Sequence, residues 1–99
     1  MDAPDEIIHQ STRLRIVAML NAQASRDMLE FGHLKTMLAM TDGNLATHLA
    51  ALEKAEYVAI DKDFVGKRPR TRVALTARGR RALRSHVAFL RSVLEGAHL

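Results

Sequence analysis

Cysteine is absent from this 99-residue chain. Its absence excludes disulfide bonds, thiolate zinc sites and thiol-based redox sensing. Aromatic residues make up only 4% of the chain although 47% of it is hydrophobic, so the core must consist of aliphatic side chains and methionine. No apolar run approaches the roughly 20 residues that a membrane-spanning helix needs, and the acidic start of the chain is unlike a signal peptide. We therefore expect a cytoplasmic protein that does not enter a membrane.

Signatures of catalysis and of metal binding are also missing. The histidines stand at positions 9, 33, 48, 86 and 98, where no two have the i, i+4 spacing of a helical metal site. The sequence contains no phosphate loop, nucleotide-binding glycine motif or nucleophile elbow. We assign no catalytic residue, no metal and no cofactor, and we do not expect an enzyme.

The net charge of +4 is distributed unevenly along the chain. Residues 1–56 carry five Lys or Arg and eight Asp or Glu, whereas residues 57–99 carry ten and three. A run of charge is usually only a solvated face. Here the basic residues gather on a predicted hairpin and the helix after it, which indicates a polyanionic partner.

Residues 41–55 have the pattern of an amphipathic helix. Leu45, Leu49 and Leu52 recur at i, i+4 and i+7 and form one apolar stripe. Thr41 is placed to accept a backbone N–H as the N-cap. The opposite face carries small or polar groups that could meet a partner: Asn44, Thr47, His48 and Ala51.

A shorter helix is predicted just before it, from Gly32 to about Ala39. Two helices joined by so few residues, the second with a polar outer stripe, are typical of a helix-turn-helix, although many unrelated helix pairs look similar. Met28–Phe31 alternates enough to be a single edge strand that could add to the hairpin described next.

Two strands with period-two hydrophobicity follow the second helix. The alternating positions are Val58, Ile60 and Phe64 in the first strand and Thr71, Val73 and Leu75 in the second. We expect Val65–Arg70 to form the tip between them, because it contains a turn glycine and a proline that cannot donate to a ladder. A polar-faced helix beside a cationic hairpin is suited to contacting a nucleic-acid duplex.

The first and last predicted helices, about 7–22 and 77–95, have wide apolar surfaces. In the last helix one apolar stripe includes Val87 and Leu90, and a second stripe contains Phe89 and Val93. A small domain cannot bury both stripes, so dimerisation is the simplest explanation; packing of the second stripe on the first helix of the same chain is the alternative. The expected interface residues are Leu14, Val17, Val87, Leu90 and Leu94.

The start of the last helix has two distinctive residues. Thr76 is the expected N-cap. Gly79 lies inside the helix, where glycine costs up to about 1 kcal/mol relative to alanine. Close packing against another element would justify it, so its expected role is structural.

Several ordered motifs together resemble the small winged helix-turn-helix DNA-binding domains related to the MarR-type and ArsR-type repressors. The motifs are TDGNL at the start of the second helix of the pair, HLAALEKAEYV at its end, GKRPRT at the hairpin tip and LTARGRRAL entering the last helix. With the RLRI run at residues 13–16, the resemblance spans nearly the whole chain.

The resemblance implies an α+β, mainly α, single domain over residues 1–99. It would comprise a helix-turn-helix at about 32–55, a small antiparallel wing at about 57–75 and long terminal helices that pair two subunits. The implied base-reading residues are Asp42, Gly43, Asn44, Thr47 and His48. The implied wing contacts are Lys67, Arg68, Arg70 and Arg72, with further phosphate contacts at Arg78 and Arg80.

The implied function is sequence-specific binding of double-stranded DNA by a homodimeric repressor at an inverted repeat. The alternatives are a winged helix protein-interaction module and a non-specific architectural protein. The retained basic tip argues against the first alternative, and the polar surface of the second helix argues against the other. An effector, if one binds, would lie between the terminal helices and the DNA-binding core; its identity is unknown.

Two positions depart from the family pattern, and one role stays open. Relatives often place Lys or Arg where Thr47 stands, which removes one phosphate contact. Relatives usually have glycine where Glu56 stands; a left-handed glutamate would cost about 1–2 kcal/mol, so we expect the helix to end differently. For His48, a phosphate contact and packing against the helix pair are equally open.

Overall fold

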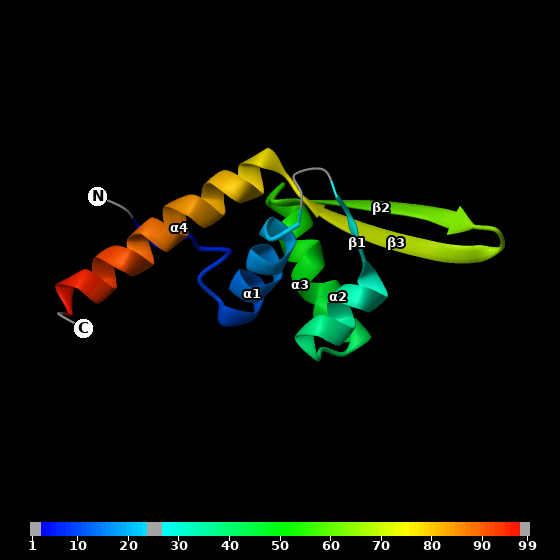
Figure 1. Cartoon of the computed structure of the whole chain (residues 1–99), viewed down its shortest axis with the longest axis horizontal. Helices are drawn as coiled ribbons and strands as arrows, with labels where there is room; N and C mark the ends of the chain where they lie inside the picture. The colour runs from blue at the N-terminus through cyan, green and yellow to red at the C-terminus, as the bar shows by residue number, and fades with distance from the viewer. Residues whose placement is uncertain (1–2, 24–26, 98–99) are drawn as a thin grey trace.

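The wing and the last helix extend in opposite directions from a body of three short helices (Figure 1). The computed structural model describes residues 3–23 and 27–97, and its principal extents are 55 × 25 × 22 Å. Within these residues the elements are α1 (Ser11–Asn21), β1 (Leu29–Glu30), α2 (Phe31–Leu38), α3 (Asp42–Lys54), β2 (Val58–Val65), β3 (Arg68–Leu75) and α4 (Ala77–Gly96). The predicted α+β, mainly helical winged helix-turn-helix fold is confirmed.

The core is aliphatic, as the scarcity of aromatic residues requires. The three leucines of the predicted stripe on α3, Leu45, Leu49 and Leu52, are all buried. The other buried hydrophobic side chains come from every helix, the sheet and the N-terminal segment: Ile8, Ile16, Val17, Leu20, Leu34, Leu38, Val58, Val73, Leu75 and Leu83.

The hairpin turns over two residues, Gly66 and Lys67. Val65 pairs with Arg68, and Gly66 has φ +63°, as expected for the first central residue of a type II′ turn. The predicted six-residue tip at Val65–Arg70 is therefore wrong, because four of those residues belong to the strands. Pro69 caused the error: a proline that cannot donate to a ladder predicts a tip residue, yet Pro69 lies in β3 and pairs with Phe64.

A proline fits there because of the alternation of the ladder. Residues next to a two-residue turn exchange hydrogen bonds, so the following pair, Phe64 and Pro69, does not need a proline N–H. Strand β1, predicted as an edge strand, pairs with β3 on its other side through Leu29–Val73 and Glu30–Arg72. From Thr71 to the turn, the wing is thus only two strands wide.

Both helices of the helix-turn-helix end in left-handed, non-glycine residues. Ala39 ends α2 with φ 53°, and Glu56 follows α3 with φ 64°. The expectation that Glu56 would avoid this conformation is wrong. Its N–H donates to Glu53 O at 2.9 Å and the next N–H, of Tyr57, donates to Leu52 O at 2.9 Å, the bond pattern of a Schellman motif. Thr76 Oγ1 also donates to Glu56 O at 2.7 Å, which helps to hold the strained residue.

The first helix begins at Ser11, four residues later than expected, because a turn centred on Asp5 precedes it. Asp5 Oδ1 accepts from the N–H groups of Ile7 and Ile8 at 2.8 Å each. Its Oδ2 accepts from Tyr57 OH at 2.6 Å, and its own N–H donates to Nδ1 of the buried His86 at 3.1 Å. These bonds fasten the N-terminal segment to the body and to α4.

The same bonds shift two pKa values. Burial raises the pKa of Tyr57 to about 12, together with its bond to the Asp5 carboxylate. Burial alone would raise the pKa of Asp5, but the bonds from Tyr57 and from the two backbone N–H groups outweigh it and leave that pKa below 3.8. Asp5 is therefore held as a carboxylate at neutral pH.

The start of α4 is fixed by its cap and by a close backbone approach. Thr76 Oγ1 accepts from Gly79 N at 2.9 Å, as predicted for the N-cap. A Cβ on Gly79 would overlap the backbone carbonyl of Tyr57, so the helix can lie here only with glycine. Among the helices of residues 3–23 and 27–97, none combines the length and the apolarity that crossing a bilayer requires.

Gly79→Ala is expected to lower the free energy of unfolding by about 1–3 kcal/mol, since the carbonyl of Tyr57 is backbone and cannot move aside cheaply. Thermal unfolding followed by circular dichroism measures the change. Gly43→Ala is the matched control: its Cβ meets nothing within 4 Å, and it should change stability by no more than a gain of about 1 kcal/mol. Equal melting temperatures for wild type and Gly79→Ala would contradict the close approach.

Candidate nucleic-acid interface

The N-terminal half of α3 presents an open surface. Asp42, Gly43, Asn44 and Thr47 are all exposed, while Leu45 between them points into the core. Thr41 Oγ1 accepts from Asn44 N at 3.2 Å, as predicted for the N-cap. Asp42 pairs with Lys35 of α2 at 2.8 Å, so part of its negative charge is compensated. Four of the five residues expected on this surface are thus accessible together.

His48 and Thr47 are engaged within the protein. His48 is half-buried, and its Nδ1 accepts from Arg13 Nε of α1 at 3.2 Å, which favours the packing alternative over a phosphate contact. Thr47 Oγ1 donates to Gly43 O at 2.9 Å. Its hydroxyl proton is therefore used inside the helix, and the methyl group and an oxygen lone pair remain for a partner.

A groove of about 290 Å³ runs between α3 and the wing. Alternate residues of the hairpin, Ile60, Lys62 and Thr71, form one wall; Ala46, Ala50 and Glu53 of α3 are on the other, with Phe31 and Leu49. The sequence prediction did not include Ala46 and Ala50 in the outer face, for which it named Asn44, Thr47, His48 and Ala51. The helical period places both beside Gly43 and Thr47, away from the leucine stripe.

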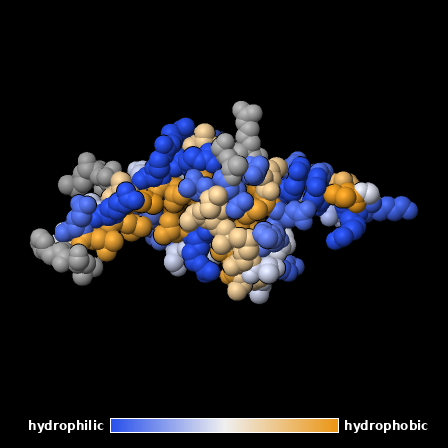
Figure 2. Space-filling model, viewed as in Figure 1, coloured by the Kyte–Doolittle hydropathy of each residue, from blue (hydrophilic) through white to orange (hydrophobic). Residues whose placement is uncertain are grey.

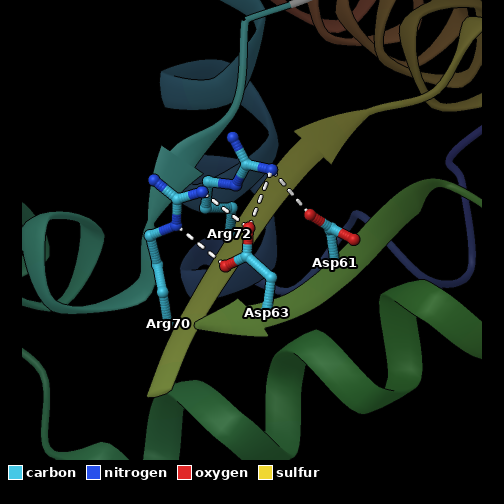
Figure 3. Close-up of polar contacts among 4 residues, drawn as sticks. All are labelled: Asp61, Asp63, Arg70 and Arg72. Atoms are coloured by element: carbon cyan, nitrogen blue, oxygen red, sulfur yellow. Dashed lines mark hydrogen bonds and ion pairs between the residues drawn. The ribbon is translucent and has the colours of Figure 1, made fainter. Parts of the chain in front are cut away.

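The opposite face of the wing carries a ladder of charge across the two strands (Figure 3). Arg70 makes two bonds to Asp63, at 2.9 and 2.6 Å. Arg72 Nη2 lies 2.7 Å from Asp61 Oδ2 and 3.5 Å from Asp63 Oδ2. The two arginines, expected as free cations, are each about 30% exposed and already paired.

This ladder sets the pKa values of its members. The two bonds from Arg70 hold the pKa of Asp63 below 3.8, and the pKa of Arg70 is raised by the same bonds. Both groups are therefore charged at neutral pH. The sequence contained the signal: with a two-residue turn, the period of two places Asp63 across from Arg70 and Asp61 across from Arg72.

The cations left open are those at the turn. Lys67 and Arg68 are exposed, and within residues 3–23 and 27–97 no acidic group lies at ion-pair distance from either. Arg78 and Arg80, the weaker candidates, have partners at the start of α4. Arg78 lies 3.3 Å from Glu56 Oε2, and Arg80 Nε donates to Asn21 Oδ1 at 3.3 Å.

The far half of α4 leaves the body with its apolar residues uncovered. Figure 2 shows a hydrophobic strip along this half, where Val93 and Leu94 are 50% and 53% exposed. Leu14, Val87 and Leu90 are half-buried. Val17, expected in a subunit interface, is instead fully buried in the core of its own chain and is not available to a second copy.

Comparison with known proteins agrees with this geometry. The family described as winged helix DNA-binding domain matches residues 12–94. An uncharacterized protein of Methanocaldococcus jannaschii is 33% identical over 82 residues, which are 83% of this chain and 86% of that protein. The solved structure of a transcriptional regulator homologue protein from Pyrococcus horikoshii is similar with a TM-score of 0.85 and 29% identity, over 96% of this chain and 91% of that one.

The Asp63 carboxyl is expected to titrate below 3.8, and Arg70→Ala should move its midpoint upward toward that value. Because the folded-state pKa is the lower one, the stabilisation from Asp63 is complete above pH 3.8 and is lost as the pH falls through the folded-state pKa. Carboxyl-detected NMR titration measures the midpoint. Arg68→Ala, which removes a cation on the same face that is not paired with Asp63, should leave the midpoint nearly unchanged. A wild-type midpoint at or above 3.8 would show that the ladder does not form in solution.

Proposed function

Because the chain belongs to the winged helix DNA-binding domain family, we propose that it is a cytoplasmic, homodimeric transcriptional repressor that binds a specific double-stranded DNA site. The observation that carries the proposal is the pairing of an exposed polar N-terminal half of α3 with an unpaired cationic turn on the same molecule. The likeness to a transcriptional regulator homologue supports the regulatory role.

In this proposal α3 is the recognition helix. The positive end of its dipole and its exposed first turn face the duplex, a geometry suited to phosphate and base edges. Asn44 is exposed, and its side-chain amide can make two hydrogen bonds to the major-groove edge of an adenine. Thr47 presents its methyl group. His48 accepts a hydrogen bond from Arg13 and so orients that side chain, and it does not contact a base itself.

Phosphate contacts at the wing come chiefly from Lys67 and Arg68. An exposed cation displaces condensed counterions when it meets a phosphate, and this release drives binding. Arg70 and Arg72 would first have to leave Asp63 and Asp61, which cancels part of any gain. We therefore assign Lys67 and Arg68 as the phosphate contacts. Arg70 and Arg72 instead stabilise the wing through their ion pairs with Asp63 and Asp61.

Two copies would pair through the projecting half of α4. The exposed apolar residues Val93 and Leu94, with the half-buried Leu90, offer a continuous strip for an equivalent strip on a second copy. A twofold pair presents two recognition helices and so selects an inverted repeat whose half-sites are about one helical turn, roughly 34–36 Å, apart. A dimer bound across such a site would block access to an overlapping promoter.

Lys67→Ala with Arg68→Ala should flatten the slope of log K against log[salt] by up to about 1.8, or about 0.9 for each phosphate that is no longer neutralised. Fluorescence anisotropy of a duplex recovered from a randomised library, measured across a salt series, gives the slope. The matched control is Asp63→Ala with Arg70→Ala, which removes one acidic and one basic side chain and so leaves the net charge unchanged, while Arg72 keeps its partner Asp61. This control should keep the wild-type slope; a slope flattened by about 0.9 would instead make Arg70 a phosphate contact.

Val93→Glu with Leu94→Glu should convert the dimer to a monomer, because two carboxylates in an apolar strip lose hydration when the copies meet. Sedimentation equilibrium with and without the duplex measures the mass. Arg91→Glu adds a carboxylate at an exposed position of the same helix and is expected to leave the dimer intact. A wild type that stays monomeric at micromolar concentration, free and on DNA, would contradict the dimer while leaving DNA binding open.

A further inference from the structure

The wing ends in an exposed aromatic side chain. Phe64 is 70% exposed, the most exposed large hydrophobic among the described residues, and it is one of only three phenylalanines in the chain. Its cross-strand partner is the exposed Pro69. Figure 2 shows hydrophobic surface at the far end of the wing, framed by hydrophilic surface. An apolar group held this far from the core does not stabilise the fold, so another use is indicated.

Its position is fixed by the hairpin. Period two places Phe64 on the same face as Ile60 and Lys62, which line the groove beside α3. The two-stranded part of the wing runs from Thr71 to Arg68, four residues or about 13 Å beyond the end of β1. Phe64 is therefore carried outward on the side of the recognition helix, with one strand pair and no helix behind it.

Cations frame this side chain. Lys62 precedes it on the same face, Lys67 follows it in the turn, and Arg68 lies next to the turn on the opposite face; all three are exposed. A partner that covers Phe64 must therefore satisfy an apolar ring and several positive charges at once. The minor groove of a duplex does so, since its walls are deoxyribose faces and its rims are phosphates.

We propose that Phe64 is an apolar wedge that enters the minor groove next to the site read by α3. There it packs between sugars and partly unstacks one base step. This inference depends on the proposed function and extends it. Lys67 and Arg68 hold the phosphates on either side, and Pro69 widens the wedge. Side chains of this kind bend the duplex toward the major groove, which brings DNA against the recognition helix.

The test is Phe64→Ala on the selected duplex, with Val65→Ala as the matched control. Val65 is 55% exposed and adjacent, but it lies on the opposite face of the hairpin. Loss of the wedge should weaken binding by about tenfold to a hundredfold, as expected for burial of an aromatic ring. The slope of log K against log[salt] should stay at its wild-type value, because every phosphate contact is kept. Val65→Ala should keep both the affinity and the slope.

A second readout reports unstacking directly. The selected duplex is made with 2-aminopurine at successive positions, and its fluorescence rises where a base step opens. Wild type and Val65→Ala should brighten one step in the flanking minor groove, and Phe64→Ala should not. Thermal unfolding of the three proteins should coincide, since both side chains lie at the surface.

Three results separate the inference from the function on which it depends. Phe64→Ala that binds like wild type, with the same fluorescence, overturns the wedge and leaves the DNA-binding function standing. Failure of the wild type to bind any duplex at low salt overturns both. A Phe64→Ala protein that keeps its DNA affinity but changes its oligomeric mass assigns the ring to a protein contact, which also overturns the wedge.

Discussion

Tyr57 connects α3, the wing, α4 and the N-terminal segment. Its N–H donates to Leu52 O at the end of α3, and its carbonyl accepts from Thr76 N at 3.0 Å, where the wing returns to the body. The same carbonyl lies against Gly79 at the start of α4. Its hydroxyl donates to Asp5 and holds the N-terminal segment. Tyr57 thus contacts the end of α3, the end of the wing, the start of α4 and the N-terminal segment.

This arrangement explains why two unfavourable backbone choices persist. Glutamate at a left-handed position costs about 1–2 kcal/mol relative to glycine. At Glu56 that conformation delivers Tyr57 to its four contacts, and Thr76 and Arg78 bind the carbonyl and the carboxylate of Glu56 in return. A glycine in the first turn of α4 is likewise tolerated because only it allows the helix to approach the Tyr57 carbonyl.

Much of the fold could be predicted because its signals are local. The leucine stripe of α3 and the caps at Thr41 and Thr76 depend on residues within one or two helical turns, and they are confirmed. The packing role of Gly79, predicted from a glycine inside a helix, is confirmed by the close approach of the Tyr57 carbonyl. The resemblance drawn from ordered motifs is confirmed by the family match over residues 12–94. The errors arose where tertiary contacts determine the start of a helix or the burial of a side chain. The burial of Val17 against the body has no local pattern. The Asp5 turn that delays α1 closes on the neighbouring Ile7 and Ile8, but its partners Tyr57 and His86 are far along the chain.

The sequence predicted which residue types form the candidate site, but it did not predict which of their side chains are already paired within the protein. The sequence prediction named four wing cations as contacts without separating paired from open ones, because a two-residue turn was not recognised and the strand register stayed unknown. Once the register is fixed, Asp61 and Asp63 face Arg72 and Arg70, and the cations divide into two paired and two open. The alternation placed Phe64 in one row with Val58 and Ile60, but period two alone does not say that the strand extends beyond the body and leaves Phe64 exposed.

The sheet narrows from three strands to two beyond β1, so the wing should become less rigid toward its turn. At Val73 and Arg72 the central strand is paired on both sides, but from Thr71 outward each residue depends on one neighbouring strand. Amide hydrogens should therefore exchange faster toward the turn, since opening a two-stranded ribbon disrupts less structure than opening the centre of a sheet. The paired arginines cross this ribbon midway and act as a clasp. The wing thus combines a stiff base, which keeps its direction, with a compliant end that can adjust to the surface it meets.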